Sequence, residues 1–151
     1  MKTAATIFAV ALLAAPAAFA ANPHGGAGSA TGGSGGTAAI NGTSATTLGT
    51  GATSTDANGN TGSAEAMGGS AAGGTNDSTK AFVHGNRNLN GQAMATARDG
   101  GTFSRSHTHC KTASGSDVNC RTKTMAHEPG SKPEMSTTNS DSSIPASMPG
   151  Q

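Results

Sequence analysis

The stretch FSRSHTHCKTASGSDVNCRTKTMA, which runs from Phe103 to Ala126, is the part of the sequence that most clearly predicts ordered structure. Its centre, Ser-Gly-Ser around Gly115, is a turn signal, and pairing the flanking residues about Gly115 produces an antiparallel hairpin. The pairs in this register are Thr112 with Val118, Cys110 with Cys120, and Thr108 with Thr122. Because directly opposed residues lie close enough for a disulfide, the sequence predicts a hairpin pinned by Cys110 and Cys120. Such a cross-link is worth about 3 kcal/mol, which favours a hairpin but does not stabilise a whole domain.

Alternation along the two strands gives the hairpin two different faces, since side chains on a strand switch sides at every residue. One face is small and mostly polar, and it collects Ser104, Ser106, Thr108, Cys110, Thr112, Val118, Cys120, Thr122 and Thr124. The other face is cationic, and it collects Arg105, His107, His109, Lys111, Asn119, Arg121 and Lys123. A cationic platform predicts binding of a polyanion, such as envelope polysaccharide, lipid head-group phosphate or nucleic acid. The residues predicted to make these contacts are Arg105, Lys111, Arg121 and Lys123. The alternative interpretation is that the positive residues only keep an edge hairpin soluble.

A second hypothesis for the same segment is a metal site. Three histidines and both cysteines lie close together in the sequence, at His107, His109, Cys110, Cys120 and His127. Zinc and copper favour such nitrogen and sulfur ligands, although the spacing is not that of a zinc finger. The site requires reduced cysteines, because a disulfide removes both thiolates. No cofactor is expected under the polyanion hypothesis, and zinc or copper is expected under this one.

The N-terminus has the three regions of a bacterial-type secretory signal peptide. Lys2 supplies a positive charge, an apolar run follows from about Ala4 to Ala15, and Ala18-Phe19-Ala20 supplies small residues before a cleavage site after about Ala20. The run is short of the roughly 20 apolar residues needed to span a bilayer. We therefore expect a mature protein in the periplasm or outside the cell, with no stable membrane insertion after cleavage. Two cysteines in an exported protein agree with a disulfide.

The composition predicts that the mature chain is mostly disordered. Removing residues 1–20 leaves 131 of the 151 residues, and 15 of these are cysteines or large apolar residues. Ordering a residue costs about 1–2 kcal/mol of backbone entropy, whereas burying one large apolar side chain returns about 1.5–3 kcal/mol. By this comparison a conventional core is excluded. The expected fold class is therefore an intrinsically disordered chain with at most one disulfide-linked β-hairpin and a transient helix, after the signal peptide.

The chain divides by composition into a signal peptide over residues 1–20 and three further segments. Residues 21–79 are rich in Gly, Ala, Ser and Thr and contain no Lys or Arg, so they predict a disordered spacer. Residues 80–127 are basic and hold both cysteines, and a transient helix is expected over Gln92–Arg98. Residues 128–151 are rich in Pro and Ser and predict a disordered tail.

These features together predict an exported protein without catalytic activity. An enzyme is disfavoured because an active site requires a packed scaffold that holds its groups in place. The expected partner is an envelope polyanion or another envelope protein. Nucleic acid is disfavoured because the aromatic residues that usually stack on bases are scarce. The alternative function is that of a periplasmic metal-binding protein.

Overall fold

Short turns connect long strands along most of the chain. The structure, a computed structural model, describes residues 6–8, 28–56, 58 and 60–144. Within these ranges the strands are β1 (Thr6–Phe8), β2 (Gly28–Ile40), β3 (Thr43–Thr55), β4 (Thr61–Ala72), β5 (Asn76–His84), β6 (Leu89–Asp99), β7 (Thr102–Thr112), β8 (Asp117–His127) and β9 (Glu134–Ser143). Asn41 and Gly42 turn between β2 and β3 with φ of 43° and 83°, and Gly100 and Gly101 turn between β6 and β7 with φ of 53° and 88°. Two-residue hairpin turns of this kind need positive φ at both positions, which asparagine and glycine tolerate best.

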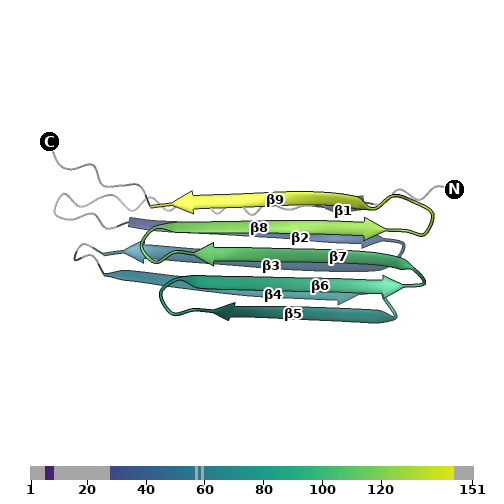
Figure 1. Cartoon of the computed structure of the whole chain (residues 1–151), viewed down its shortest axis with the longest axis horizontal. Helices are drawn as coiled ribbons and strands as arrows, with labels where there is room; N and C mark the ends of the chain where they lie inside the picture. Colours follow the sequence, from purple (N-terminus) through teal and green to yellow (C-terminus); the bar gives the residue numbers. More distant parts are fainter. Residues whose placement is uncertain (1–5, 9–27, 57, 59, 145–151) are drawn as a thin grey trace.

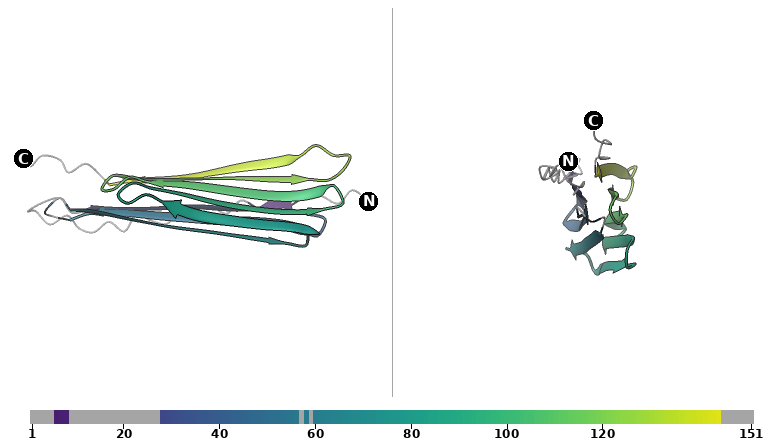
Figure 2. Two further views of the ribbon diagram at one scale, coloured as in Figure 1. Left: turned by 60° about the horizontal axis from the view of Figure 1, so that its bottom comes forward. Right: turned by 90° about the vertical axis from the view of Figure 1, so that its left-hand side faces the viewer.

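The strands form two antiparallel sheets that stack face to face (Figure 1). One sheet has the order β1-β2-β3-β4 and the other the order β5-β6-β7-β8-β9. The chain passes from the first sheet to the second in the short turn between β4 and β5. In the stack, β2 lies over β7 and β8, β3 lies over β6 and β7, and β4 lies over β6. The end-on view in Figure 2 shows the two layers, with the outer side of each sheet uncovered by the other described strands.

This fold contradicts the prediction of a mostly disordered chain. β2, β3 and β4 occupy much of residues 21–79, and β9 lies within residues 128–151, although both segments are predicted to be disordered. The predicted hairpin is present as β7 and β8, with Cys110 opposite Cys120, but it lies inside a five-stranded sheet rather than alone. The predicted signal peptide and its cleavage site lie outside the described residues except for Thr6–Phe8, which pairs with β2 as β1. The described part of the chain includes no helix long and apolar enough to cross a membrane.

The transient helix predicted over Gln92–Arg98 is also wrong, because this segment is the middle of β6. Ala93, Ala95 and Ala97 are fully buried between the sheets, and the residues between them face outward. Alanine favours a helix in isolation, but pairing with β5 and β7 and burial of every second residue outweigh that preference here.

The interior between the sheets is made of small side chains. Its buried members are mostly alanine, serine and threonine, with Ile40, Val118 and the two cysteines as the larger or softer ones. Several glycines leave no room for a larger residue: a Cβ at Gly36 would lie 2.7 Å from Cγ2 of Thr124 and 2.9 Å from Cγ2 of Thr122. The two backbones therefore approach closely, and contact between many small groups replaces the burial of a few large ones.

A chain of hydroxyl groups crosses this interior and joins both sheets. We call the five residues Ser34, Thr47, Ser106, Thr108 and Thr122 the hydroxyl chain. Ser34 Oγ lies 2.7 Å from Thr122 Oγ1, which lies 2.6 Å from Thr108 Oγ1. Thr108 Oγ1 lies 2.7 Å from Thr47 Oγ1, which lies 2.6 Å from Ser106 Oγ. Ser106 finally donates to the backbone carbonyl of Gly36 at 2.9 Å. Burial of these polar groups is therefore compensated by hydrogen bonds.

The direction of the hydroxyl chain follows from its two ends. Ser106 has one hydroxyl proton, which it donates to the Gly36 carbonyl, so Thr47 must donate to Ser106. The same reasoning makes Thr108 donate to Thr47 and Thr122 donate to Thr108, and it leaves Thr122 free to accept from Ser34. Bonds aligned in this way polarise one another in the same sense, which strengthens each of them.

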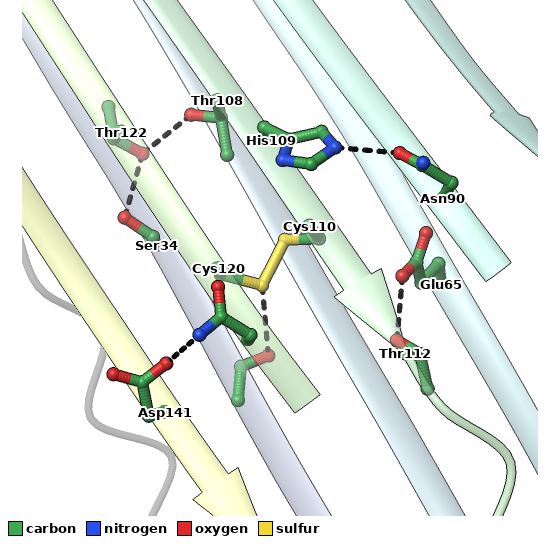
Figure 3. The surroundings of a disulfide bond; sticks show 12 residues. Ser34, Glu65, Asn90, Thr108, His109, Cys110, Thr112, Cys120, Thr122 and Asp141 are labelled. Carbon is green, nitrogen blue, oxygen red and sulfur yellow. Dashed lines mark hydrogen bonds between the residues drawn. A yellow bond between two sulfur atoms is a disulfide. The ribbon is translucent and has the colours of Figure 1, made fainter. Parts of the chain in front are cut away.

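A partly buried carboxylate lies near the disulfide, at one end of the interior (Figure 3). Oε1 of Glu65 accepts a hydrogen bond of 2.7 Å from the Thr112 hydroxyl, and Oε2 is buried without a hydrogen-bond partner among the described residues. Burial raises the pKa of Glu65 above its usual value of 4.5, and the Thr112 bond and the nearby His84 only partly oppose this rise. The charged form of Glu65 is therefore disfavoured in the folded protein.

We predict that Gly36→Ala destabilises the protein and that Gly68→Ala does not. The new methyl group at position 36 must displace methyl groups of Thr122 and Thr124, which should lower the free energy of unfolding by about 1–3 kcal/mol. A Cβ at Gly68, also in a strand, meets nothing within 4 Å, so alanine there should be neutral or stabilising by a few tenths of a kcal/mol. Urea unfolding followed by far-ultraviolet circular dichroism measures both. Equal effects at the two positions would contradict the close approach of the sheets.

We predict that Glu65→Gln removes a pH dependence of stability. A carboxyl group with a raised pKa contributes stability that is fully present below 4.5 and is lost as the pH rises through the raised pKa. The wild-type free energy of unfolding should therefore fall from acid toward neutral pH by more than that of Glu65→Gln. Glu134→Gln, at an exposed carboxylate of β9, is the matched control and should follow the wild type. Parallel curves for Glu65→Gln and the wild type would show the prediction to be wrong.

Candidate functional site

The outer side of the five-stranded sheet gathers most of the cationic side chains of the described chain. Residues that are opposite one another in neighbouring strands lie on the same side of a sheet, so the strand register places each side chain. Most inward positions of β6, β7 and β8 are buried, and most of the alternate positions are half-buried or exposed. Six exposed cations lie on this outer side, and we call them the basic face: Lys80, Arg98, Arg105, Lys111, Arg121 and Lys123.

Five of these cations form a diagonal stripe across the sheet. Successive outward residues of a strand are about 7 Å apart and neighbouring strands about 4.8 Å apart, so a diagonal step between Cα atoms is about 8 Å. From Arg98 in β6 the stripe moves one strand and one position to Arg105 in β7, and again to Lys123 in β8. It continues to Arg121 in the same strand and returns to Lys111 at the end of β7. The sheet therefore presents a continuous line of positive charge.

Acidic residues do not neutralise this stripe. Asp77 and Glu134 are opposite the inward Ala97 and Ala126, so their positions lie on the other side of the sheet. Two carboxylates, Asp117 and Asp141, share the outer side at the end of the sheet near the β7–β8 turn. Asp141 accepts a hydrogen bond from Asn119. Within the part of the chain that the structure describes, no ion pair joins a cation of the basic face to a carboxylate.

Two histidines lie in the middle of the stripe, and their surroundings keep them neutral. Burial, together with the charges of Arg105, His109 and Lys123, lowers the pKa of His107 below its usual value of 6.5. Burial and Lys111 lower the pKa of His109, whose Nε2 lies 2.7 Å from Oδ1 of Asn90. At neutral pH the positive charge of the face therefore comes from its arginines and lysines.

Two shallow grooves indent the basic face and share Arg105 and Met125. The first, of about 440 Å³, lies beside the β6–β7 turn and is also lined by Arg98 and Phe103. The second, of about 410 Å³, crosses β7, β8 and β9, and its further lining includes His107, Arg121, Lys123 and Met135. Cationic and apolar side chains therefore line both grooves, which adjoin at Arg105 and Met125.

The structure places the four predicted polyanion-binding residues, Arg105, Lys111, Arg121 and Lys123, together on this one face. Sequence reasoning missed Lys80 and Arg98, because β5 and β6 were not recognised as strands. The signal for Arg98 is present in the sequence, since Ala93, Ala95 and Ala97 alternate with larger side chains at the period of a strand. For Lys80 there is no such alternation, because every residue of β5 is exposed.

The five residues of the predicted metal site are not brought together. Cys110 and Cys120 form a disulfide with Cα atoms 4.1 Å apart, and both are fully buried between the sheets. His107 and His109 lie on the opposite side of the sheet from the sulfur atoms, and the ring of His127 packs against Phe103 with centroids 5.2 Å apart. No cluster of three or more His, Cys, Asp or Glu side chains suited to a metal occurs among the described residues.

Comparison with known proteins adds no further information about the site. No protein-family model matches the chain, and no curated protein or solved structure shows significant similarity to it. The functional argument therefore depends on the geometry and chemistry of the basic face.

We predict that the native protein contains no free thiol and takes up no zinc. Both sulfur atoms are held in the disulfide, and His107 and His109 lie beside arginines and lysines that repel a cation. Thiol titration in denaturant, with and without prior reduction, measures the first point, and isothermal titration with zinc measures the second. Two free thiols with stoichiometric zinc uptake would restore the metal-site hypothesis.

Proposed function

We propose that this is an exported, non-catalytic protein that binds a polyanion through the basic face. The observation that carries the proposal is the collection of six exposed cations on one open side of a sheet, without internal ion pairs among the described residues. Residues at distant positions, such as Lys80, Arg98 and Arg121, share this side only because of the strand register. Charges that merely keep a protein soluble need no such segregation.

The electrostatics of the face support a binding role. Cations without carboxylate partners give up no internal ion pair when they contact an anion, and they release the counterions of the polyanion into solution. The stripe offers a charge about every 7–8 Å, so an extended anionic chain can contact several cations at once. The open shape also supports binding rather than catalysis, because a catalytic centre requires enclosed and rigidly held groups.

Export is the second part of the proposal. The disulfide between Cys110 and Cys120 is compatible with an oxidising environment outside the cytoplasm. The signal-peptide pattern of residues 1–20 indicates the same route, and we propose the periplasm or the extracellular space as the location of the mature protein. The expected ligand is then an anionic component of the cell envelope.

We predict that retention on heparin depends on salt and on the basic face. Arg121→Ala combined with Lys123→Ala should elute at clearly lower salt than the wild type, because two neighbouring members of the stripe are lost. The matched control combines Arg87→Ala with Lys132→Ala, which removes the same charge from the β5–β6 and β8–β9 turns. The control should elute close to the wild type.

Two results would contradict the proposal. Unchanged elution of the Arg121 and Lys123 variant would show that the face does not contact the polyanion. Equal shifts of the variant and the control would show that retention follows net charge alone, without a localised site.

A further inference from the structure

Four large apolar side chains are exposed in the described chain, and two of them border the basic face. Phe82 is 50% exposed and Met135 is 70% exposed, whereas Val83 and Leu48, at 39% and 45%, lie elsewhere. Phe82 belongs to β5 and is opposite Gln92, and Met135 belongs to β9 and is opposite Met125, so both face the outer side. β5 and β9 are the two edge strands of this sheet. The basic face therefore has one exposed apolar residue at each lateral margin.

The separation of these margins is set by the sheet itself. Four strand spacings of about 4.8 Å place β5 and β9 about 19 Å apart, with the cationic stripe between them. On the β9 side, Met125 and Met135 line the same groove as Arg121 and Lys123. Apolar tips and positive charges are thus side by side on one surface that no described strand covers (Figure 2).

We infer that the basic face docks on the surface of an anionic lipid bilayer. The inference deepens and rests on the proposed function, because it identifies the polyanion as a layer of lipid head groups. The stripe contacts the phosphates, and Phe82 and Met135 enter the boundary between head groups and acyl chains. Each cation near an anionic membrane surface adds affinity, and each apolar tip adds the burial of its own surface.

A lipid surface matches the face better than a soluble polyanion does. A soluble anionic chain needs only the stripe, so it leaves Phe82 and Met135 in water on either side of it. A bilayer is a broad surface that meets both margins and the stripe simultaneously. A bilayer also offers phosphate and hydrocarbon together. Arg121 and Lys123 complement the phosphate, Met135 complements the hydrocarbon, and all three side chains line one groove.

The opposite outer side of the molecule provides an internal control. β2 and β3 contain no charged residue, and the one charged residue of β4, Glu65, points into the interior. Leu48 is exposed on that side to nearly the same extent as Phe82. An apolar residue without neighbouring cations should contribute little to contact with an anionic membrane.

The test uses sedimentation of the exported protein, without the predicted signal peptide of residues 1–20, with large vesicles. One vesicle type contains phosphatidylglycerol mixed with phosphatidylcholine, and the other contains phosphatidylcholine alone. Wild type is compared with Phe82→Ser combined with Met135→Ser, and with Leu48→Ser as the matched control. Heparin retention and the circular dichroism spectrum are measured for each protein. These substitutions are at exposed positions, so all three proteins should have the same spectrum.

We expect wild type and Leu48→Ser to bind the anionic vesicles only, and the Phe82 and Met135 variant to bind them about tenfold or more weakly with unchanged heparin retention. Equal vesicle binding by that variant and the wild type would overturn the lipid assignment. Salt-dependent heparin retention without vesicle binding would also overturn it, and would leave the proposed function intact with a soluble ligand. Binding to neither probe would remove the proposed function as well.

Discussion

Close approach of two sheets through small side chains is the constraint on which the rest of this structure depends. The hydroxyl chain from Ser34 to Ser106 spans both layers; each of its members donates a hydrogen bond, and each except Ser34 also accepts one from another member. A one-residue slip of β7 or β8 would turn that strand's hydroxyls toward solvent and bring charged neighbours into the interior. The register of the two sheets is therefore determined by hydrogen bonding and by lack of space, rather than by large hydrophobic residues.

The same constraint creates the basic face. Because the interior is filled mostly by small groups, the long side chains of β7 and β8 occupy the alternate, outward positions, as does Arg98 of β6. Arg98, Arg105 and Lys123 come from three different strands, and the register aligns them into a stripe. The inner surface of this sheet therefore consists mainly of small side chains, and the outer surface carries the long cationic ones. The exposed Phe82 and Met135 lie at its edges because they belong to β5 and β9, which have a neighbouring strand on one side only.

The prediction of disorder failed because it counted only large apolar side chains as a source of stability. Glycine and alanine lose no side-chain entropy on burial, and serine and threonine lose little, so a core of these residues has a lower side-chain entropic cost than one of longer side chains. Threonine also buries a methyl group while its hydroxyl bonds within the interior, as Thr47 and Thr108 do. Two turn signals also went unused, Asn41-Gly42 and Gly100-Gly101, although such dipeptides are typical of two-residue hairpin turns.

What the sequence by itself determined is local: the turn around Gly115, the pairing of Cys110 with Cys120, and the alternation that places Arg105 and Lys123 on one side of a hairpin. These features depend on the period of a strand and on residues close together in the chain. Only the tertiary structure decided that this hairpin lies within a sheet, that β6 is a strand rather than a helix, and that Lys80 and Arg98 join the same face. The physical reason is that small polar residues carry almost no intrinsic preference for one fold. Their stabilisation comes from contacts between segments far apart in sequence, such as Ser34 with Thr122, which exist only once both sheets have formed.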